Sequence, residues 1–365
     1  MASKFVRAGS YSGDTEYFHI CVPDVTLHSS IFTSSSRVRL VNGNGVKFLE
    51  GSGAEYLAGW HADRATLATA HELGLQYSSD VLTGAARAGD LTKVMWLHTE
   101  QHCEVDHQRV CDHAAIGGST AVLAWLKQLG VALADEACIA AARHHQMPVL
   151  QYLHAEGCHM SQKVCYWAAH EGDLVMLKWA YEHGCTLIDE NDDICEAAAS
   201  SHNVDLMAWL IQQPGVELTA FAMCAAAEIG DIAMCEFLHA NQCPWDEECC
   251  LSAAHTRLLR HGELDMLRWF REHGCPWDTD ELAHQAAECD SVALMEYLQQ
   301  QGVVFNAEQL SELLNAAGAR GNLTAAKWLR GQGAEWPAVL SDIMFKWYGD
   351  TLAWARAEGC TSPLD

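Results

Sequence analysis

Apolar residues in this chain follow a helical spacing, and the stretch 163–185 shows it most clearly. Residues 176–180 carry one apolar stripe, residues 164–169 carry a second and shorter one, and Gly172 lies between the two. Spacings of three and four residues are typical of amphipathic helices, and a glycine between two such stripes favours a turn. The pattern therefore predicts a unit made of a helix, a tight turn, a second helix and a loop.

This unit recurs along most of the chain, at intervals of 26 to 32 residues. An aromatic residue in an apolar cluster marks each copy, and these residues are Trp96, Trp125, Tyr152, Trp179, Trp209, Phe237, Trp269, Tyr297, Trp328 and Trp354. Eleven residues before most of them comes a pair of alanines, as Ala168-Ala169 comes before Trp179. Such a period predicts a repeat solenoid, because no unit can bury its apolar face alone. We expect the alanines to let helices approach closely and Trp179 to be a core residue between units.

The loops end in residues that favour helix starts. Ser161, Asp246, Asp278 and Asn306 each stand nine residues after their aromatic and are predicted N-caps. Asn306 also has capping-box spacing to Gln309. The start of each first helix is therefore set by local sequence.

The register Ala168-Ala169, Gly172, Met176-Leu177, Trp179 and Gly184 resembles the ankyrin repeat family over roughly residues 55–360. The resemblance implies an all-α, right-handed solenoid of stacked helix-turn-helix units whose concave face binds a protein partner. Two features depart from the family. Its Thr-Pro-Leu-His start is replaced here by residues 163–166, and the period is shorter than the family's ~33 residues. The repeats therefore look like a short variant rich in tryptophan and cysteine.

Two segments are predicted. Residues 1–52 do not repeat, and we expect them to be partly disordered with a small hairpin at Asn42-Gly-Asn-Gly45. Residues 53–365 are predicted to form the solenoid, with degenerate capping units at both ends. A displaced alanine pair indicates an insertion near residues 256–260.

Charge narrows the expected partners. The chain has 22 Lys and Arg against 48 Asp and Glu, a net charge of -26. So acidic a protein repels phosphate backbones, which argues against a nucleic-acid partner. Residues 151–250 hold 17 acids and two bases, which gives 17 − 2 = 15 negative charges and favours a basic protein or peptide. The sequence shows no signal peptide or membrane span, so we expect a cytoplasmic monomer with its 16 cysteines reduced.

Cysteine and histidine raise the question of a metal or a catalytic thiol. No Cys-x-x-Cys pair is present, and the position of Cys158 and Cys185 is taken by Val131 and Val303 in other units. A position that accepts valine is a packing position, where a free cysteine behaves as a small hydrophobe. The chain also lacks a Gly-rich phosphate loop, a nucleophile elbow and an HExxH helix. We therefore expect no metal, no cofactor and no enzymatic activity.

Two features keep more than one interpretation. The acidic run 189–193 fails the EF-hand pattern because Ile194 stands where glycine is needed, so it is a solvated loop or a docking site for a basic partner. Trp245, Trp277 and Trp336 lie in loops. They either cover the next helix or anchor a partner.

The predicted partner site lies on the outward side of the first helices, at nine, twelve and thirteen residues before each aromatic. Its predicted residues are Ile139, Arg143, Tyr166, Trp167, His170, Asp189, Glu190, Asp192, Asp193, Glu196, Ser200 and Glu228. The function that follows is a non-enzymatic protein–protein interaction scaffold. The alternative is an adaptor that recruits a target to a larger complex, such as a ubiquitin ligase, through its N-terminal segment.

The interchange of cysteine with valine predicts that folding needs neither metal nor disulfides. Excess chelator together with reductant should leave the helical circular dichroism of the purified protein unchanged. A large loss of helicity on chelation alone would contradict this prediction.

Overall fold

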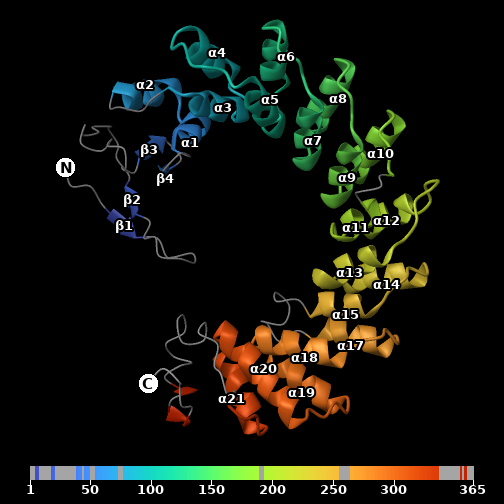
Figure 1. Cartoon of the computed structure of the whole chain (residues 1–365). Coiled ribbons are helices and arrows are strands. Elements are labelled where there is room, and N and C mark those ends of the chain that lie inside the picture. The colour runs from blue at the N-terminus through green and yellow to red at the C-terminus, as the bar shows by residue number, and fades with distance from the viewer. Residues whose placement is uncertain are drawn as a thin grey trace. The chain divides into compact units, whose positions relative to one another are not determined.

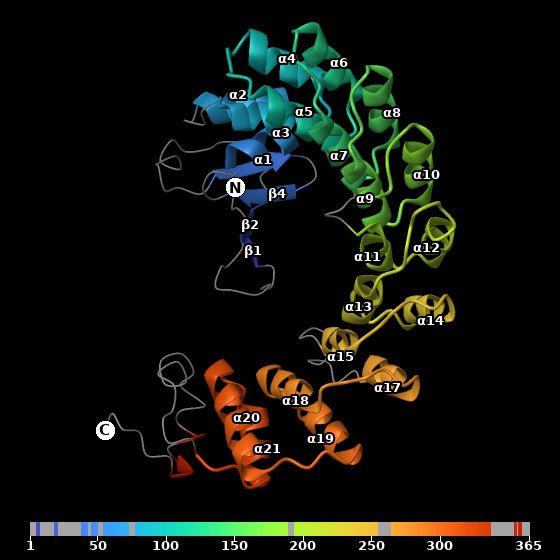
Figure 2. The ribbon, with the colours of Figure 1, turned by 45° about the vertical axis from the view of Figure 1, so that its right-hand side comes forward.

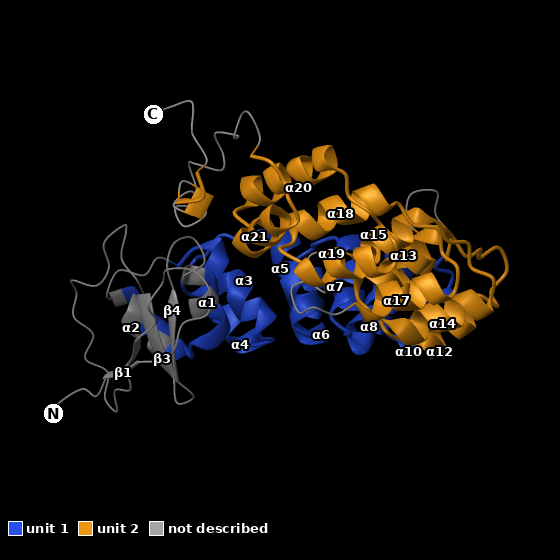
Figure 3. Ribbon diagram, turned by 90° about the horizontal axis from the view of Figure 1, so that it is seen from below, with its two compact units in different colours: residues 1–186 blue, residues 187–365 orange. Residues whose placement is uncertain are grey.

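The computed structural model describes residues 5–7, 18–20, 38–42, 45–49, 54–72, 77–188, 193–254, 264–336, 354–355 and 357–359. Two compact units divide the chain, unit 1 over residues 1–186 and unit 2 over residues 187–365 (Figure 3). In each unit, short helices alternate as first and second members of helix-turn-helix pairs (Figure 1). The prediction of a helical-repeat solenoid is confirmed.

Unit 1 contains the first five helix pairs and two short hairpins. Its strands and helices are β1 (Phe5–Arg7), β2 (Phe18–Ile20), β3 (Val38–Asn42), β4 (Gly45–Leu49), α1 (Ala54–His61), α2 (Arg64–Glu72), α3 (Ser79–Arg87), α4 (Leu91–Thr99), α5 (His107–Ile116), α6 (Thr120–Gln128), α7 (Asp135–Arg143), α8 (Met147–Ala155), α9 (Gln162–His170) and α10 (Leu174–Glu182). In the second hairpin, Val38 pairs with Leu49 and Asn42 with Gly45, where the sequence predicts a hairpin. The predicted disorder of residues 1–52 falls on segments outside the described residues.

Unit 2 continues the same alternation. Its helices are α11 (Ile194–Ala199), α12 (Val204–Leu210), α13 (Ala220–Glu228), α14 (Ile232–Ala240), α15 (Glu247–Ala253), α17 (Asp265–Glu272), α18 (Thr279–Glu288), α19 (Val292–Gln300), α20 (Ala307–Arg320) and α21 (Leu323–Gly331). The insertion predicted near residues 256–260 lies outside the described residues, as does most of the predicted C-terminal capping unit.

First helices stack on first helices in both units. In unit 1 the contacts run α1–α3–α5–α7–α9, which Figure 2 shows side by side, and in unit 2 they run α11–α13–α15–α18–α20. The alanine pairs lie in these contacts and are fully buried: Ala85, Ala86, Ala114, Ala115, Ala141, Ala142, Ala168 and Ala169. The close approach inferred from paired alanines is therefore present. At Gly84 in α3, an added Cβ would come 1.9 Å from the carbonyl oxygen of Tyr56 in α1.

The turn inside most of the described pairs has a left-handed residue followed by a helix cap. Gly172 has φ +72°, and the carboxylate of Asp173 then accepts from the backbone N–H of Met176 at 2.9 Å. His202 occupies the glycine position in another pair, with φ +59°. A non-glycine residue there is strained. Its imidazole hydrogen-bonds Asp231 of the next pair at 2.9 Å, which offsets part of that strain.

The predicted caps of the first helices are mostly present. Asp246 accepts from the N–H of Glu248, and Asn306 forms a full capping box with Gln309. Asp278 accepts from two backbone N–H groups of its helix. Ser161 occupies the N-cap position, but its side chain forms no cap hydrogen bond.

The aromatic that marks each repeat is buried to different degrees. Trp96 and Trp125 are 8% exposed and Trp269 is 7% exposed. Trp179 is only half-buried, with its ring stacked on His183 at 4.2 Å and edge-on to His154 at 5.6 Å. The expectation that Trp179 is a core residue is therefore wrong. Its ring is covered by imidazoles, not by core side chains, and stays partly exposed.

The loop tryptophans cover the following repeat. Trp245 lies 5.9 Å from the ring of Trp269, and Trp277 lies 6.1 Å from Tyr297. Trp336 lies 5.4 Å from the ring of Trp354. These contacts favour the covering role over that of an interface anchor.

Loop cysteines connect consecutive repeats through hydrogen bonds. The thiol of Cys185 donates to the carbonyl of Ser161 at 3.3 Å, Cys243 to Thr219 at 3.3 Å and Cys275 to Asp246 at 3.2 Å. All three cysteines are buried. The three cysteines share one position within the repeat, where they both pack and form the same S–H···O=C contact between loops.

The tight contact of α3 on α1 gives a test of the stacking. Gly84→Ala should cost at least the upper end of the ~1–3 kcal/mol typical of overpacking, because the new Cβ meets backbone that cannot move aside. Gly331→Ala is the matched control, since Gly331 is also helical but has open space around its Cβ position. The control should be neutral or stabilising by up to ~1 kcal/mol. Equal effects of the two changes on the free energy of unfolding would contradict this account.

Candidate functional site

The predicted partner residues fall into two groups, one in each unit. Ile139, Arg143, Tyr166, Trp167 and His170 lie on α7 and α9 of unit 1 and are exposed or half-buried. In unit 2, Glu196 and Glu228 are exposed on α11 and α13, and Ser200 is half-buried. Asp189, Glu190 and Asp192 lie outside the described residues.

Of the acidic run 189–193, the structure describes Asp193, and this residue has a structural role. The carboxylate of Asp193 caps α11 by accepting from the backbone N–H groups of Cys195 at 2.8 Å and Glu196 at 3.2 Å. It also accepts a hydrogen bond from the hydroxyl of Thr219. Its charge is thus engaged within the protein.

Arginines and tryptophans meet on the first helices of unit 1. The guanidinium of Arg87 on α3 lies over the ring of Trp60 on α1, 4.4 Å from its centroid. Arg143 on α7 lies over Trp167 on α9 in the same way, at 4.3 Å. The ring of Tyr166 lies edge-on to the ring of Trp167, with 5.6 Å between the two centroids. Each pair joins neighbouring helices of the stack and places a cation against an aromatic face.

Two imidazoles lie between these pairs. The hydroxyl of Tyr56 hydrogen-bonds Nδ1 of His113 at 3.0 Å. Burial lowers the pKa of His113, and the charges of Arg87 and Arg109 lower it further. Burial also lowers the pKa of His144, which the charges of Arg87 and Arg143 depress further. Arg87 therefore acts on both imidazoles.

We call this set the arginine–aromatic surface. It consists of Trp60, Arg87, His113, Arg143, His144 and Trp167. Among the described residues, Arg87 and Arg143 form no salt bridge, whereas Arg109 nearby is paired with Asp80 at 2.8 Å. The charges of the two arginines thus lie against aromatic rings.

Sequence reasoning found only one end of this surface. Arg143 and Trp167 were predicted at nine and twelve residues before their aromatics. Arg87 and His113 stand at those same offsets from Trp96 and Trp125, so the rule would have found both in the earlier repeats. Trp60 precedes the regular repeats, and its sequence position carried no signal.

The equivalent face in unit 2 is acidic. Burial raises the pKa of Glu196, and the charges of Asp193 and Glu228 raise it further. Carboxylates on α11 and α13 thus repel one another where unit 1 places arginines. The predicted site joined residues from two faces that differ in charge.

The described residues include one group that could hold a metal. Cys224, Asp246 and Cys249 offer ligand atoms that all lie within 4.8 Å of one another. The described helices include none that is long and apolar enough to cross a membrane.

The lowered pKa values of His113 and His144 predict a pH effect on stability. Each histidine binds a proton less readily in the folded protein than in the unfolded chain. The free energy of unfolding should therefore fall as the pH drops from about 6.5 through the lowered folded values. Urea unfolding of His113→Gln should show a smaller fall than the wild type, whereas His159→Gln, an exposed control, should match it. An equal fall in all three proteins would contradict the assignment.

Comparison with known proteins gives a result for the fold alone. No family model and no curated protein matches the chain. Solved structures do match, among them the pentatricopeptide repeat protein PPR10 in complex with an 18-nucleotide psaJ RNA element, and a variant of it with three cysteines replaced by serine. Each has 13% sequence identity and a TM-score of 0.30 and covers 84% of this chain. This chain spans 57% of the length of those proteins.

Two sequence-based predictions need correction. The solved structures that match hold RNA, whereas the sequence led us to expect a protein or peptide partner and to exclude nucleic acid. That exclusion relied on net charge, which averages over surfaces that differ locally. The matches also do not show that the repeats are ankyrin repeats in particular. The chain is a helical-repeat protein.

Proposed function

We propose that this chain is a non-catalytic helical-repeat protein that binds single-stranded RNA on the arginine–aromatic surface of unit 1. The observation that carries the proposal is the pair of arginines held over Trp60 and Trp167 on neighbouring first helices. The RNA in the solved structures does not carry it, because a TM-score of 0.30 transfers no ligand.

The chemistry of this surface suits an unpaired strand. Single-stranded RNA is bound by stacking its bases on aromatic rings or guanidinium planes and by placing cations along its phosphates. Trp60 and Trp167 supply rings, and Arg87 and Arg143 supply planar cations beside them. Protonation of His113 and His144 would add charge close to the phosphates. We therefore expect tighter binding as the pH falls through the histidine pKa values.

The net charge of -26 limits the affinity but does not prevent binding. At physiological ionic strength, exposed charges are largely screened beyond ~8 Å, so acids elsewhere act weakly on this surface. They would still repel a strand that extends past it. The expected ligand is thus a short unpaired segment, and the expected binding is sensitive to salt.

Catalysis is not part of this proposal. Burial raises the pKa of Cys111 and of Cys138 to about 12, which supports a structural role for these thiols rather than a nucleophilic one. The free cysteines of the described chain are in keeping with a reducing, intracellular compartment, which we also propose. We further propose an ankyrin-type origin for the repeats, which their helix, left-handed glycine, helix order supports.

Fluorescence anisotropy with labelled oligoribonucleotides tests the function. Trp167→Ala should weaken binding by the ~1–3 kcal/mol expected for loss of one stacking platform. Arg143→Ala should weaken it for every sequence and flatten the dependence of log K on log salt by about one unit.

Arg271→Ala is the matched control. Arg271 lies 4.7 Å over the ring of Trp277 in unit 2, so its loss removes the same kind of contact from residues that are not part of the proposed site. The control should bind RNA like the wild type. Absence of RNA binding by the wild type, or equal weakening by Arg143→Ala and Arg271→Ala, would overturn the proposal.

A further inference from the structure

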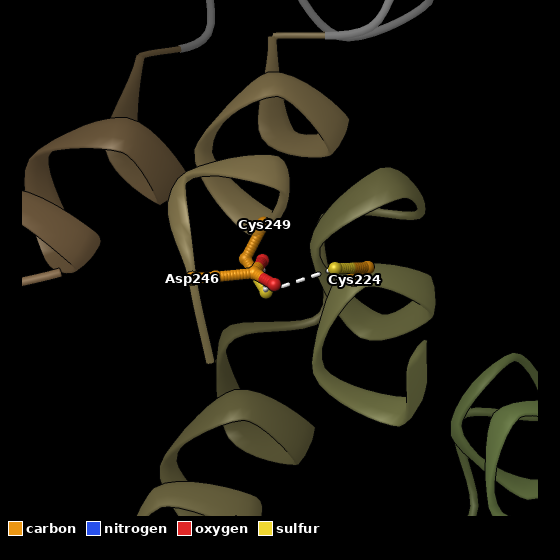
Figure 4. Close-up of side chains that lie close together, drawn as sticks. All are labelled: Cys224, Asp246 and Cys249. Atoms are coloured by element: carbon orange, nitrogen blue, oxygen red, sulfur yellow. Dashed lines mark hydrogen bonds between the residues drawn. The ribbon is translucent and has the colours of Figure 1, made fainter. Parts of the chain in front are cut away.

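Two thiols and a carboxylate converge where α13 meets the start of α15 (Figure 4). The Sγ atoms of Cys224 on α13 and Cys249 on α15 lie 2.9 Å apart. The Sγ of Cys249 lies 3.8 Å from Oδ1 of Asp246, the N-cap of α15. Three ligand atoms of the kinds that bind zinc thus face one point.

The position of Cys224 in its repeat mostly holds polar residues. It stands thirteen residues before its aromatic, where other repeats have Thr83, Asp112, Ile139, Tyr166, Glu196, His284 and Asn315. These residues are polar or partly exposed, and Cys224 is itself half-buried. The interchange with valine found at the position of Cys158 and Cys185 is thus not found at the position of Cys224.

The surroundings of the two thiols favour a cation. The Sγ atoms of Cys224 and Cys249 are so close, at 2.9 Å, that two thiolates there would repel each other unless a cation lay between them. Asp246 adds a further negative charge beside them. Its two side-chain contacts both use Oδ1, one with Cys249 and one with the backbone N–H of Glu248 at 3.2 Å, which leaves Oδ2 for a metal. A divalent ion would compensate two of these three negative charges.

We propose that Cys224, Cys249 and Asp246 bind a zinc-like divalent cation through their two sulfurs and one carboxylate oxygen, with water in the fourth position. Tetrahedral coordination with Zn–S bonds of ~2.3 Å places the sulfurs about 3.7 Å apart, so the thiols separate slightly as the metal enters. Each thiol gives up its proton to solvent on binding. Asp246 is exposed, which gives the ion a path from solvent.

Other thiol pairs in the described chain lack this arrangement. Cys165 with Cys185 and Cys250 with Cys275 are neighbours, yet neither pair has a third ligand atom in range. The carboxylate therefore distinguishes the proposed site. The metal would stabilise unit 2 by binding only its folded form, without being needed for helicity.

Metal titration of the reduced, chelator-treated full-length protein tests the site. Zn²⁺ added against a chromophoric competitor should bind at one equivalent per chain and release about two protons. Co²⁺ should give thiolate-to-cobalt charge-transfer absorption. Cys224→Ser should lower that absorption, because only the thiolate of Cys249 remains, and should weaken zinc by more than the ~10–100-fold typical of losing an outer-shell partner. Asp246→Asn should weaken zinc while the absorption persists at saturating cobalt.

Cys158→Ser is the matched control. Cys158 is also half-buried, and its thiol donates to the carbonyl of Leu133 at 3.4 Å, a contact that a serine hydroxyl can keep. This variant should bind both metals like the wild type. Circular dichroism should show that Cys224→Ser remains folded, as its partly exposed position allows.

Three results would overturn the proposal. The first is the absence of stoichiometric binding. The second is equal loss of binding in Cys224→Ser and Cys158→Ser. The third is a wild-type protein that binds no metal under reductant and forms a Cys224–Cys249 disulfide on mild oxidation, because the pair would then be a redox pair.

Discussion

The first helices of each unit approach one another until backbone meets backbone, and small residues make that contact possible. Gly84 on α3 has no room for a Cβ against the carbonyl of Tyr56, and Gly59 on α1 has none against that of Val81. The alanine pairs continue the contact through the later first helices. A helix of nine residues is too short to be stable alone, so this stacking is what holds the repeat in its fold.

Close stacking also decides which side chains can act together. Because each first helix lies beside the next, side chains on neighbouring first helices contact each other. The contacts of Arg87 with Trp60 and of Arg143 with Trp167 are two examples. The same geometry brings Glu196 and Glu228 together in unit 2. One scaffold thus presents a cationic, aromatic face in one unit and an acidic face in the other.

Local chemistry made part of the structure predictable. Alanine pairs and aromatics recur in the sequence, so the helix-turn-helix unit and the stacking of these units could be predicted from their spacing. Caps such as Asn306 need only neighbouring residues, and they were predictable for the same reason. The turn at His202 was not, because a histidine in the left-handed region depends on its hydrogen bond to Asp231 in the next repeat. Trp179 was misjudged because the imidazoles that cover its ring come from two repeats.

The sequence by itself determined the fold class, the period and the places where helices begin, since these follow from residue type and spacing along one chain. Only the tertiary structure decided which side chains share a surface. The total charge of -26 led to the exclusion of a nucleic-acid partner, yet folding places Arg87 beside His113 and His144. Folding likewise brings Cys224 to Cys249, 25 residues away in sequence. Distances between repeats depend on how helices stack, and no pattern within a single repeat contains them.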